Sequence, residues 1–88
     1  MTEVDIWIKV LESLNFSMVE EHCFQTKTNL LIYSRESTKT KLYFNRETEN
    51  VTGFWIDFSG LLTMNKEKFQ EDNKELFRDI ILSSIIID

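Results

Sequence analysis

The 88-residue sequence contains no proline and only two glycines, Gly53 and Gly60. Both residue types interrupt regular structure, so their scarcity predicts no flexible linker and no low-complexity segment. Without a linker, and with a length that suits one hydrophobic core, residues 1–88 are expected to form a single compact domain. The two glycines flank an apolar segment and stand seven residues apart, which excludes a glycine-rich loop for phosphate binding.

Residues that commonly perform catalysis or bind metals are almost missing. His22 is the only histidine and Cys23 the only cysteine. If their segment is a strand, the two side chains point to opposite faces and cannot act together as base and nucleophile. One histidine and one cysteine cannot form a zinc site without carboxylates, and Glu20 and Glu21 are only a weak signal for one. The sequence therefore predicts a protein that is not an enzyme and that has no metal ion and no cofactor.

Signals for export and for membrane insertion are also missing. A lone cysteine cannot form an internal disulfide, which fits a reducing compartment. The N-terminus carries acidic residues where a signal peptide needs a basic stretch followed by an apolar run. No apolar stretch approaches the ~20 residues of a membrane span. We therefore expect a cytoplasmic protein that does not enter a membrane.

Charge is distributed unevenly along the chain, although the formal net charge is only -5. Residues 1–26 hold five acids and one lysine, residues 27–46 hold five cations and one glutamate, and residues 47–88 hold nine acids and four cations. The start and the end of the chain are therefore acidic, and the middle is basic. Such an asymmetry influences association and solubility but does not determine the fold.

The spacing of apolar residues predicts a helix near each end of the chain. Thr2 followed by Asp5 has the pattern of a capping box, and apolar residues then recur at helical spacing over residues 3–14. Asn65 is a suitable N-cap for a second helix over residues 66–82. The side chains that this second helix is expected to bury are Phe69, Leu76, Phe77 and Ile80.

Between the two helices, short runs of β-branched and aromatic residues are separated by polar clusters. These runs predict strands at about residues 18–26, 29–35, 40–46 and 51–58. The connections are too short for crossover helices, so neighbouring strands should pair antiparallel, as a three- to four-stranded meander. The expected fold class is α+β, a two-layer sandwich with both helices on one face of the sheet.

The expected second helix carries four acids that are spaced four residues apart. They are Glu67, Glu71, Glu75 and Asp79. One interpretation is an ordinary solvated helix face, on which Lys68, Lys74 and Arg78 pair with nearby acids. The other interpretation, which we adopt as the functional hypothesis, is a docking face for a basic surface on a partner protein.

Trp55 is the expected anchor of that contact. Strand alternation places it on the face opposite Phe54 and Ile56, beside Tyr33 or Tyr43. An exposed tryptophan on a sheet can supply much of the binding energy of a protein interface. The alternative is a cross-strand aromatic pair that only stabilises the sheet.

The basic middle of the chain allows a different function, the binding of a nucleic acid or a small anion. Its candidate residues are Lys39, Lys41, Tyr43 and Arg46, because aromatic rings can stack on bases while cations neutralise phosphates. Five cations are few for such a protein, and the pI of about 4.8 is far below the usual basic value, so nucleic acid is not the expected partner. The same cations would also protect an exposed sheet edge from pairing.

Three isoleucines near the end of the sequence, Ile85, Ile86 and Ile87, favour a terminal strand over a helix end. Such a strand could add to a sheet edge of this chain or of a second copy, so a homodimer is a further expectation. A structural subunit whose function is self-association is accordingly the third functional class.

The functional hypothesis is a non-enzymatic protein-binding domain that acts as a small acidic inhibitor or adaptor. In this mechanism the acids would steer the approach to a basic partner, and Trp55 would supply the buried contact. The size, the acidity and the order of helix, sheet and helix resemble those of small bacterial secretion chaperones, immunity proteins and phage inhibitors of host defence. The resemblance is one of type, and it implies a protein that holds or blocks one partner.

Overall fold

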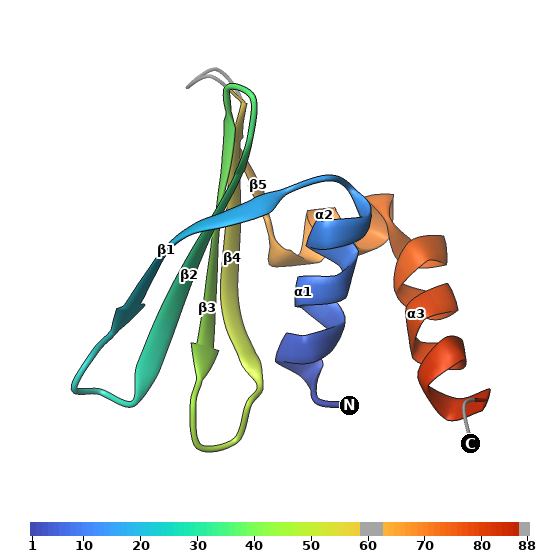
Figure 1. Cartoon of the computed structure of the whole chain (residues 1–88), viewed down its shortest axis with the longest axis horizontal. Helices are drawn as coiled ribbons and strands as arrows, with labels where there is room; N and C mark the ends of the chain where they lie inside the picture. The colour runs from blue at the N-terminus through green and yellow to red at the C-terminus, as the bar shows by residue number, and fades with distance from the viewer. Residues whose placement is uncertain (59–62, 87–88) are drawn as a thin grey trace.

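The computed structural model of the protein describes residues 1–58 and 63–86. The elements in chain order are α1 (Glu3–Ser13), β1 (Ser17–Cys23), β2 (Thr28–Arg35), β3 (Thr38–Asn45), β4 (Val51–Phe58), β5 (Thr63–Asn65), α2 (Lys66–Asp72) and α3 (Lys74–Ile86) (Figure 1). The predicted α+β class, with helices on either side of an antiparallel meander in the sequence, is confirmed.

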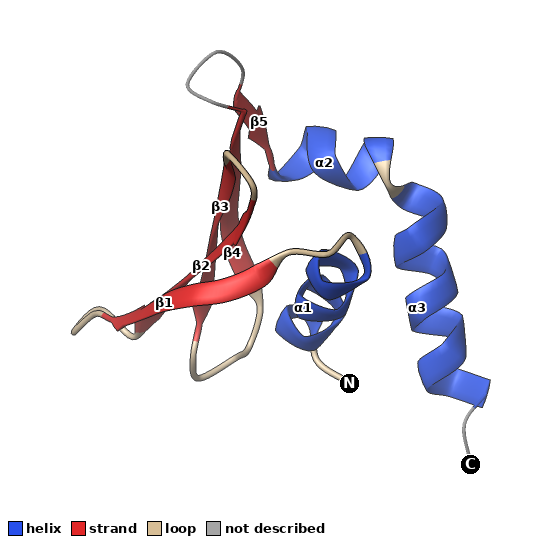
Figure 2. Ribbon diagram, turned by 45° about the horizontal axis from the view of Figure 1, so that its top comes forward, coloured by secondary structure: helices blue, strands red, loops and turns tan. Residues whose placement is uncertain are grey.

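The strands form one antiparallel sheet of five strands in the order β1-β2-β3-β4-β5. All three helices lie on the same side of this sheet (Figure 2). The sequence predicts at most four strands, whereas β5 adds a fifth by pairing Met64 with Ile56 and Asn65 with Trp55. A strand of three residues is too short to display an alternating pattern, which is why it was not predicted.

The N-terminal cap of α1 is formed as predicted. The Thr2 hydroxyl accepts a hydrogen bond from the Asp5 backbone N–H, with 3.3 Å between the heavy atoms, and the Asp5 carboxylate accepts one from the Thr2 N–H at 3.2 Å. At the other end, the Arg35 guanidinium donates to the Leu14 carbonyl oxygen at 2.6 Å and lies 4.5 Å from the centre of the Phe16 ring. Arg35 therefore fixes the turn that leads from α1 into β1.

The helix predicted over residues 66–82 is in fact two helices. α2 has the predicted N-cap, since Asn65 Oδ1 accepts from the Lys68 N–H at 3.1 Å, but it ends at Asp72. At the break, the Asn73 side-chain amide donates to the Phe69 carbonyl oxygen at 3.0 Å. A side chain that competes for a helical carbonyl in this way weakens the helix. α3 then continues in a new direction (Figure 2).

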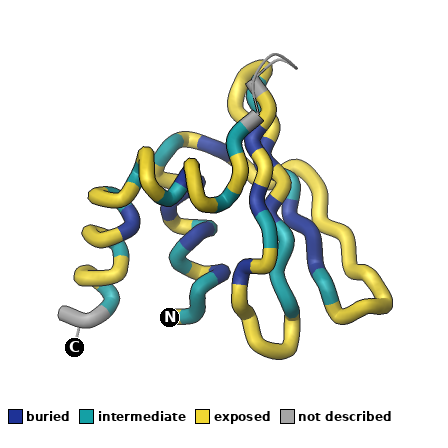
Figure 3. Tube along the Cα trace, turned by 180° about the vertical axis from the view of Figure 1, so that it is seen from behind, coloured by how far each residue is buried: buried dark blue, intermediate teal, exposed yellow. Residues whose placement is uncertain are grey.

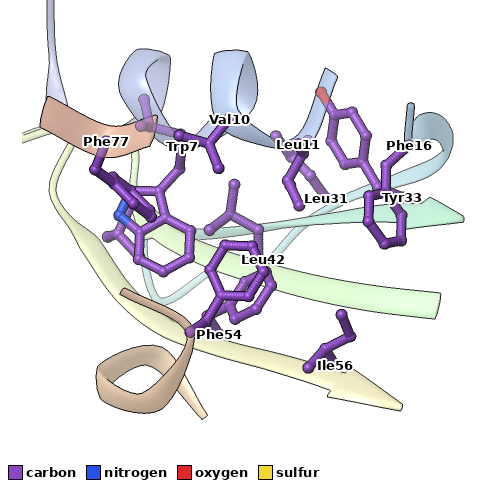
Figure 4. Packing of buried hydrophobic residues seen from close by; sticks show 13 residues of the cluster. Trp7, Val10, Leu11, Phe16, Leu31, Tyr33, Leu42, Phe54, Ile56 and Phe77 are labelled. Atoms are coloured by element: carbon purple, nitrogen blue, oxygen red, sulfur yellow. The ribbon is translucent and has the colours of Figure 1, made fainter. Parts of the chain in front are cut away.

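Trp7 of α1 lies at the centre of the core and is 0% exposed. Its ring centroid lies 4.8 Å from that of Phe54 on β4, 5.5 Å from that of Phe69 on α2 and 4.9 Å from that of Phe77 on α3. The nitrogen side of the indole faces Phe77 (Figure 4). Trp7 thus joins the sheet and all three helices in one aromatic cluster, which contributes more than the buried area alone.

Two polar residues tie the N-terminal helix to the later elements. Glu3 Oε1 accepts from the Val51 N–H at 2.7 Å, and Lys66 Nζ lies 3.7 Å from Glu3 Oε2. The same Lys66 ammonium donates to the Val51 carbonyl oxygen at 3.2 Å. The start of α1, the start of β4 and the start of α2 therefore share one partly buried polar junction.

The prediction of a terminal strand is wrong for Ile85 and Ile86, because both residues belong to α3. Ile87 lies outside the described residues. β-propensity depends strongly on context, and here α3 continues through Ile85 and Ile86. The addition of this segment to a sheet edge is therefore not the basis for a homodimer.

Candidate functional site

The outer face of the sheet is the face that the helices do not cover. Side chains in a strand alternate between the two faces, so every second residue of β1 to β4 points to this side. The register aligns Glu20, Ile32, Lys41 and Trp55 in one row across the four strands. A shallow hollow of about 610 Å³ follows this row. It is lined by Glu20, Ile32, Lys39, Lys41, Tyr43, Trp55 and Asp57.

Trp55 is the most prominent apolar residue of this hollow. It lies on the face of the sheet opposite Phe54 and Ile56, as the strand alternation predicts. It is 51% exposed, between Lys41 on β3 and Asn65 on β5. Of the two tyrosines expected beside it, only Tyr43 lines the hollow. Tyr33 is 4% exposed and belongs to the core on the other face, so that alternative was wrong.

Tyr43 lines the hollow and lies opposite Gly53 of β4 in the register. A Cβ atom added at Gly53 would lie 3.6 Å from Tyr43 Cδ1, so the tyrosine side chain lies directly over the glycine backbone. A glycine in a strand commonly marks such a close approach. The Tyr43 ring therefore lies at van der Waals distance from the place that a Cβ atom of residue 53 would take.

The charges around the hollow balance one another. Lys39 is the register partner of Asp57, while Glu20 and Lys41 stand in the same row as Trp55. The described side chains that line the hollow thus carry two positive and two negative charges. Lys39 and Lys41 lie on β3, the middle strand, so the expectation that these cations protect a sheet edge is wrong.

Arg46 does not belong to the hollow, although the sequence groups it with Lys39, Lys41 and Tyr43. Its Nη1 atom donates to the Phe24 carbonyl oxygen at 2.8 Å and to Asn29 Oδ1 at 3.0 Å. These acceptors belong to the β1–β2 turn and the start of β2, and Arg46 itself follows β3. Arg46 therefore links the ends of two neighbouring hairpins.

The acidic row of the sequence is divided by the break at Asn73. Glu67 and Glu71 lie on α2, whereas Glu75 and Asp79 lie on α3. Two ion pairs on these helices agree with the interpretation of an ordinary solvated helix face. Lys68 Nζ lies 3.2 Å from the Asp72 carboxylate, and Lys74 Nζ lies 3.7 Å from that of Glu71. The four acids therefore do not form one continuous ladder.

The structure separates Trp55 from the four acids with which the sequence grouped it. Trp55 is exposed on the outer face, in register with Lys41. The helices that carry the acids, α2 and α3, lie on the other side of the sheet (Figure 2). Instead, Trp55 shares its hollow with Lys39, Lys41 and Tyr43, which the sequence assigned to the alternative function. The register of the β3–β4 hairpin was the signal that could have joined these residues, because it pairs Lys41 with Trp55.

His22 and Cys23 do not form a reactive pair. His22 Nε2 lies 3.1 Å from Glu20 Oε1, and the register places His22 opposite Leu30 and Cys23 opposite Asn29. Consecutive residues of a strand point to opposite faces, as predicted for these two. Within residues 1–58 and 63–86, no group of three or more histidine, cysteine or acidic side chains is arranged to hold a metal ion.

Comparisons of this chain with protein-family models, with curated proteins and with solved structures give no match. In the part of the chain that the structure describes, no helix is both long enough and apolar enough to cross a membrane.

Proposed function

We propose that the protein is a non-enzymatic protein-binding domain of the inhibitor or adaptor type, whose partner docks on the outer face of the sheet. The observation that carries this proposal is Trp55, a half-exposed tryptophan in a hollow on an uncovered face. Burying this side chain removes a large apolar area from water. Tryptophan is also enriched among the residues that dominate binding energies at protein interfaces.

The mixed charges around Trp55 support a protein as the partner. Two cations and two anions line the described hollow, so its formal charge is zero. A partner protein can place opposite charges against each of them, which gives specificity and fixes orientation. A polyanion would meet the carboxylates of Glu20 and Asp57 as well as the lysines, and repulsion would offset part of its attraction.

The acids of α2 and α3 belong to the proposal as steering groups and not as contacts of the anchor. Glu67, Glu71, Glu75 and Asp79 contribute to the net charge of -5. An acidic protein attracts a basic partner at long range, and this effect raises the association rate and falls with added salt. The partner would then be retained by the contact at Trp55.

The test is an affinity capture from the native host's lysate with four baits, at low and at high salt. The baits are the wild type, Trp55→Ala, Leu82→Ala and a variant with lysine at the four acids of α2 and α3. Leu82 is the matched control, because it is 46% exposed on α3 and its removal also shortens a large exposed apolar side chain. We expect one protein to be retained by the wild type and Leu82→Ala and lost with Trp55→Ala.

The four-acid variant separates steering from anchoring. With the purified partner, it should lower the association rate constant and its salt dependence while leaving the dissociation rate nearly unchanged. Trp55→Ala should raise the dissociation constant at least about 30-fold, the size expected of an interface hot spot. Wild-type affinity in Trp55→Ala would refute the proposed site.

A single-stranded nucleic acid is the second candidate, because the hollow brings Lys39, Lys41, Tyr43 and Trp55 together. Aromatic and basic residues on an open sheet face can stack bases and neutralise phosphates. Titration with a mixed-sequence oligonucleotide, followed by Trp55 fluorescence, tests this function. It requires salt-sensitive quenching that is lost when Lys39 and Lys41 are both changed to glutamate.

Self-association is the third candidate, and it rests on Ile81 and Leu82, which are exposed on α3. Light scattering after size-exclusion chromatography, at concentrations across the micromolar range, decides it. A monomer throughout would exclude the homodimer.

A cytoplasmic setting is also part of the proposal, because Cys23 is a free and exposed thiol, which fits a reducing compartment.

A further inference from the structure

Strand β1 is a sheet edge whose residues are all exposed. Its neighbour in the sheet is β2, and each of its seven residues is exposed to solvent (Figure 3). The large apolar side chains of Met18, Val19 and Phe24, on and just after this strand, are between 43% and 52% exposed. Natural proteins usually shorten, cover or charge such an edge, because it can pair with another strand.

The part of this edge that can pair with an added strand is Glu20–Cys23. A bulge shifts the register between Met18 and Glu20, and regular pairing with β2 then continues from Glu20 to Cys23. In an antiparallel strand the backbone hydrogen-bonding groups alternate in direction, so half of those in this run point away from β2. An added strand can pair with them, as in β-augmentation.

Two consecutive acids give this edge a negative charge on both faces of the sheet. Glu20 lies in the row of Ile32 on the outer face, and Glu21 is the register partner of Leu31 on the helical face. Glu12 of α1 adds negative charge on the helical side, since Glu12 and Glu21 both act on the buried Tyr33 phenol. Cations on a neighbouring strand would therefore be attracted on either face.

We propose that β1 binds an extended segment of a partner protein that carries two adjacent basic residues. Consecutive residues of the added strand point to opposite faces, so one cation would meet Glu20 and the next would meet Glu21. The backbone pairing would supply affinity, and the two cations would supply register and specificity. This surface is separate from the Trp55 contact, although Glu20 lies at the border of both.

A second copy of the chain fits this edge less well. Two β1 strands related by a twofold axis through Glu20 would place that carboxylate against its own copy, and an axis through Glu21 would do the same there. Like charges that face each other directly across two strands are destabilising. The charge pattern of β1 therefore favours a basic segment over an identical strand.

The experiment uses the full chain as bait for a displayed library of random ten-residue peptides. We expect the wild type to enrich segments with two adjacent lysine or arginine residues between β-branched or aromatic residues. The charge reversal Glu20→Lys with Glu21→Lys should weaken binding of these peptides about tenfold or more, and should itself enrich adjacent acidic pairs. The matched control is Glu36→Lys with Glu49→Lys, which makes the same change in net charge at two exposed residues of the β2–β3 and β3–β4 connections, and it should bind like the wild type.

A second measurement tests the backbone pairing directly. An enriched peptide should slow the hydrogen exchange of amides within Glu20–Cys23, and the same peptide with N-methyl groups at alternate residues should not bind. Trp55→Ala should leave this binding unchanged, so the outcome is independent of the proposed function. The inference is overturned if no basic pair is enriched, if the β1 reversal binds equally well, or if free chains dimerise through β1.

Discussion

The two faces of the sheet hold the two tryptophans in opposite environments. Trp7, which packs against the inner face, is 0% exposed and contacts Phe54, Phe69 and Phe77. Trp55, on the outer face, is 51% exposed beside Lys41 and Asn65. The same residue type thus has two roles here, since only the inner face has helices to bury it. The buried cluster lies on the inner face, and the candidate site lies on the outer face.

The largest expected effect is the difference in stability between the two tryptophan variants. Trp7→Ala should lower the free energy of unfolding by about 3 to 5 kcal/mol, because it removes the centre of the aromatic cluster. That loss is a large part of the ~5 to 15 kcal/mol that stabilises a typical domain. Trp55→Ala should change stability by less than about 1 kcal/mol. Urea denaturation followed by circular dichroism measures both, and equal losses would contradict the difference between the faces.

A smaller effect should distinguish the two kinds of cation in the basic segment. Arg46→Ala should cost about 1 to 2 kcal/mol, because it leaves the Phe24 carbonyl and the Asn29 side chain without their charged donor. Lys41→Ala, on the outer face, should stay within about 0.5 kcal/mol of the wild type. Thermal unfolding of the two variants under identical conditions is the measurement. A loss with Lys41→Ala as large as with Arg46→Ala would mean that both cations are structural.

Tyr33 makes the inner face sensitive to alkaline pH. Its burial, and then the charges of Glu12 and Glu21, raise the pKa of the phenol above 10.0. The folded protein therefore holds this proton to higher pH than the unfolded chain does. The resulting stabilisation is complete below about pH 10 and is lost as the pH rises through the folded pKa.

Urea denaturation at pH values between about 9 and 11 tests this dependence. The wild type should lose more stability over this window than Tyr33→Phe, which has no phenol to ionise. Tyr43→Phe is the matched control, because it changes a tyrosine of the outer face and keeps Tyr33. If Tyr43→Phe flattened the pH dependence and Tyr33→Phe did not, the assignment to Tyr33 would be wrong.

The smallest expected effect is a difference in fluorescence quenching between the two tryptophans. Acrylamide quenches exposed indoles, so it should quench Trp55 strongly and Trp7 weakly in the wild type. Trp55→Phe should remove the accessible part of the emission and lower the quenching constant severalfold. Strong quenching in that variant would show that the interior around Trp7 opens to solvent.

Local signals were enough to predict much of the fold. Thr2 and Asn65 marked the start of a helix correctly, because a cap depends only on a few neighbouring residues. The alternation around Trp55 also gave the correct face, since the period of a strand is independent of its partners. The order of the strands followed from short connections, which force neighbours along the chain to pair.

Two of the signals that failed depend on distant parts of the chain, whereas the break at Asn73 is local. At the break the Asn73 side-chain amide donates to the Phe69 carbonyl oxygen, four residues earlier, although the apolar spacing continues through the break. Asparagine is only mildly unfavourable within a helix, so composition alone does not predict a break there. Arg46 could be recognised as a structural residue only after its acceptors on another hairpin were known. The site was misgrouped for the same reason, because Lys41 and Trp55 meet through strand register.

The aromatic cluster also bears on the time at which the protein can fold. Trp7 is synthesised before its partner Phe77, which follows 70 residues later, the difference between positions 7 and 77. At the usual ~5 to 20 residues per second, the ribosome needs about 4 to 14 seconds to make that stretch. During this interval the apolar side of α1 has no complete surface to bury it. The fold around Trp7 is therefore completed only after α3 has been synthesised.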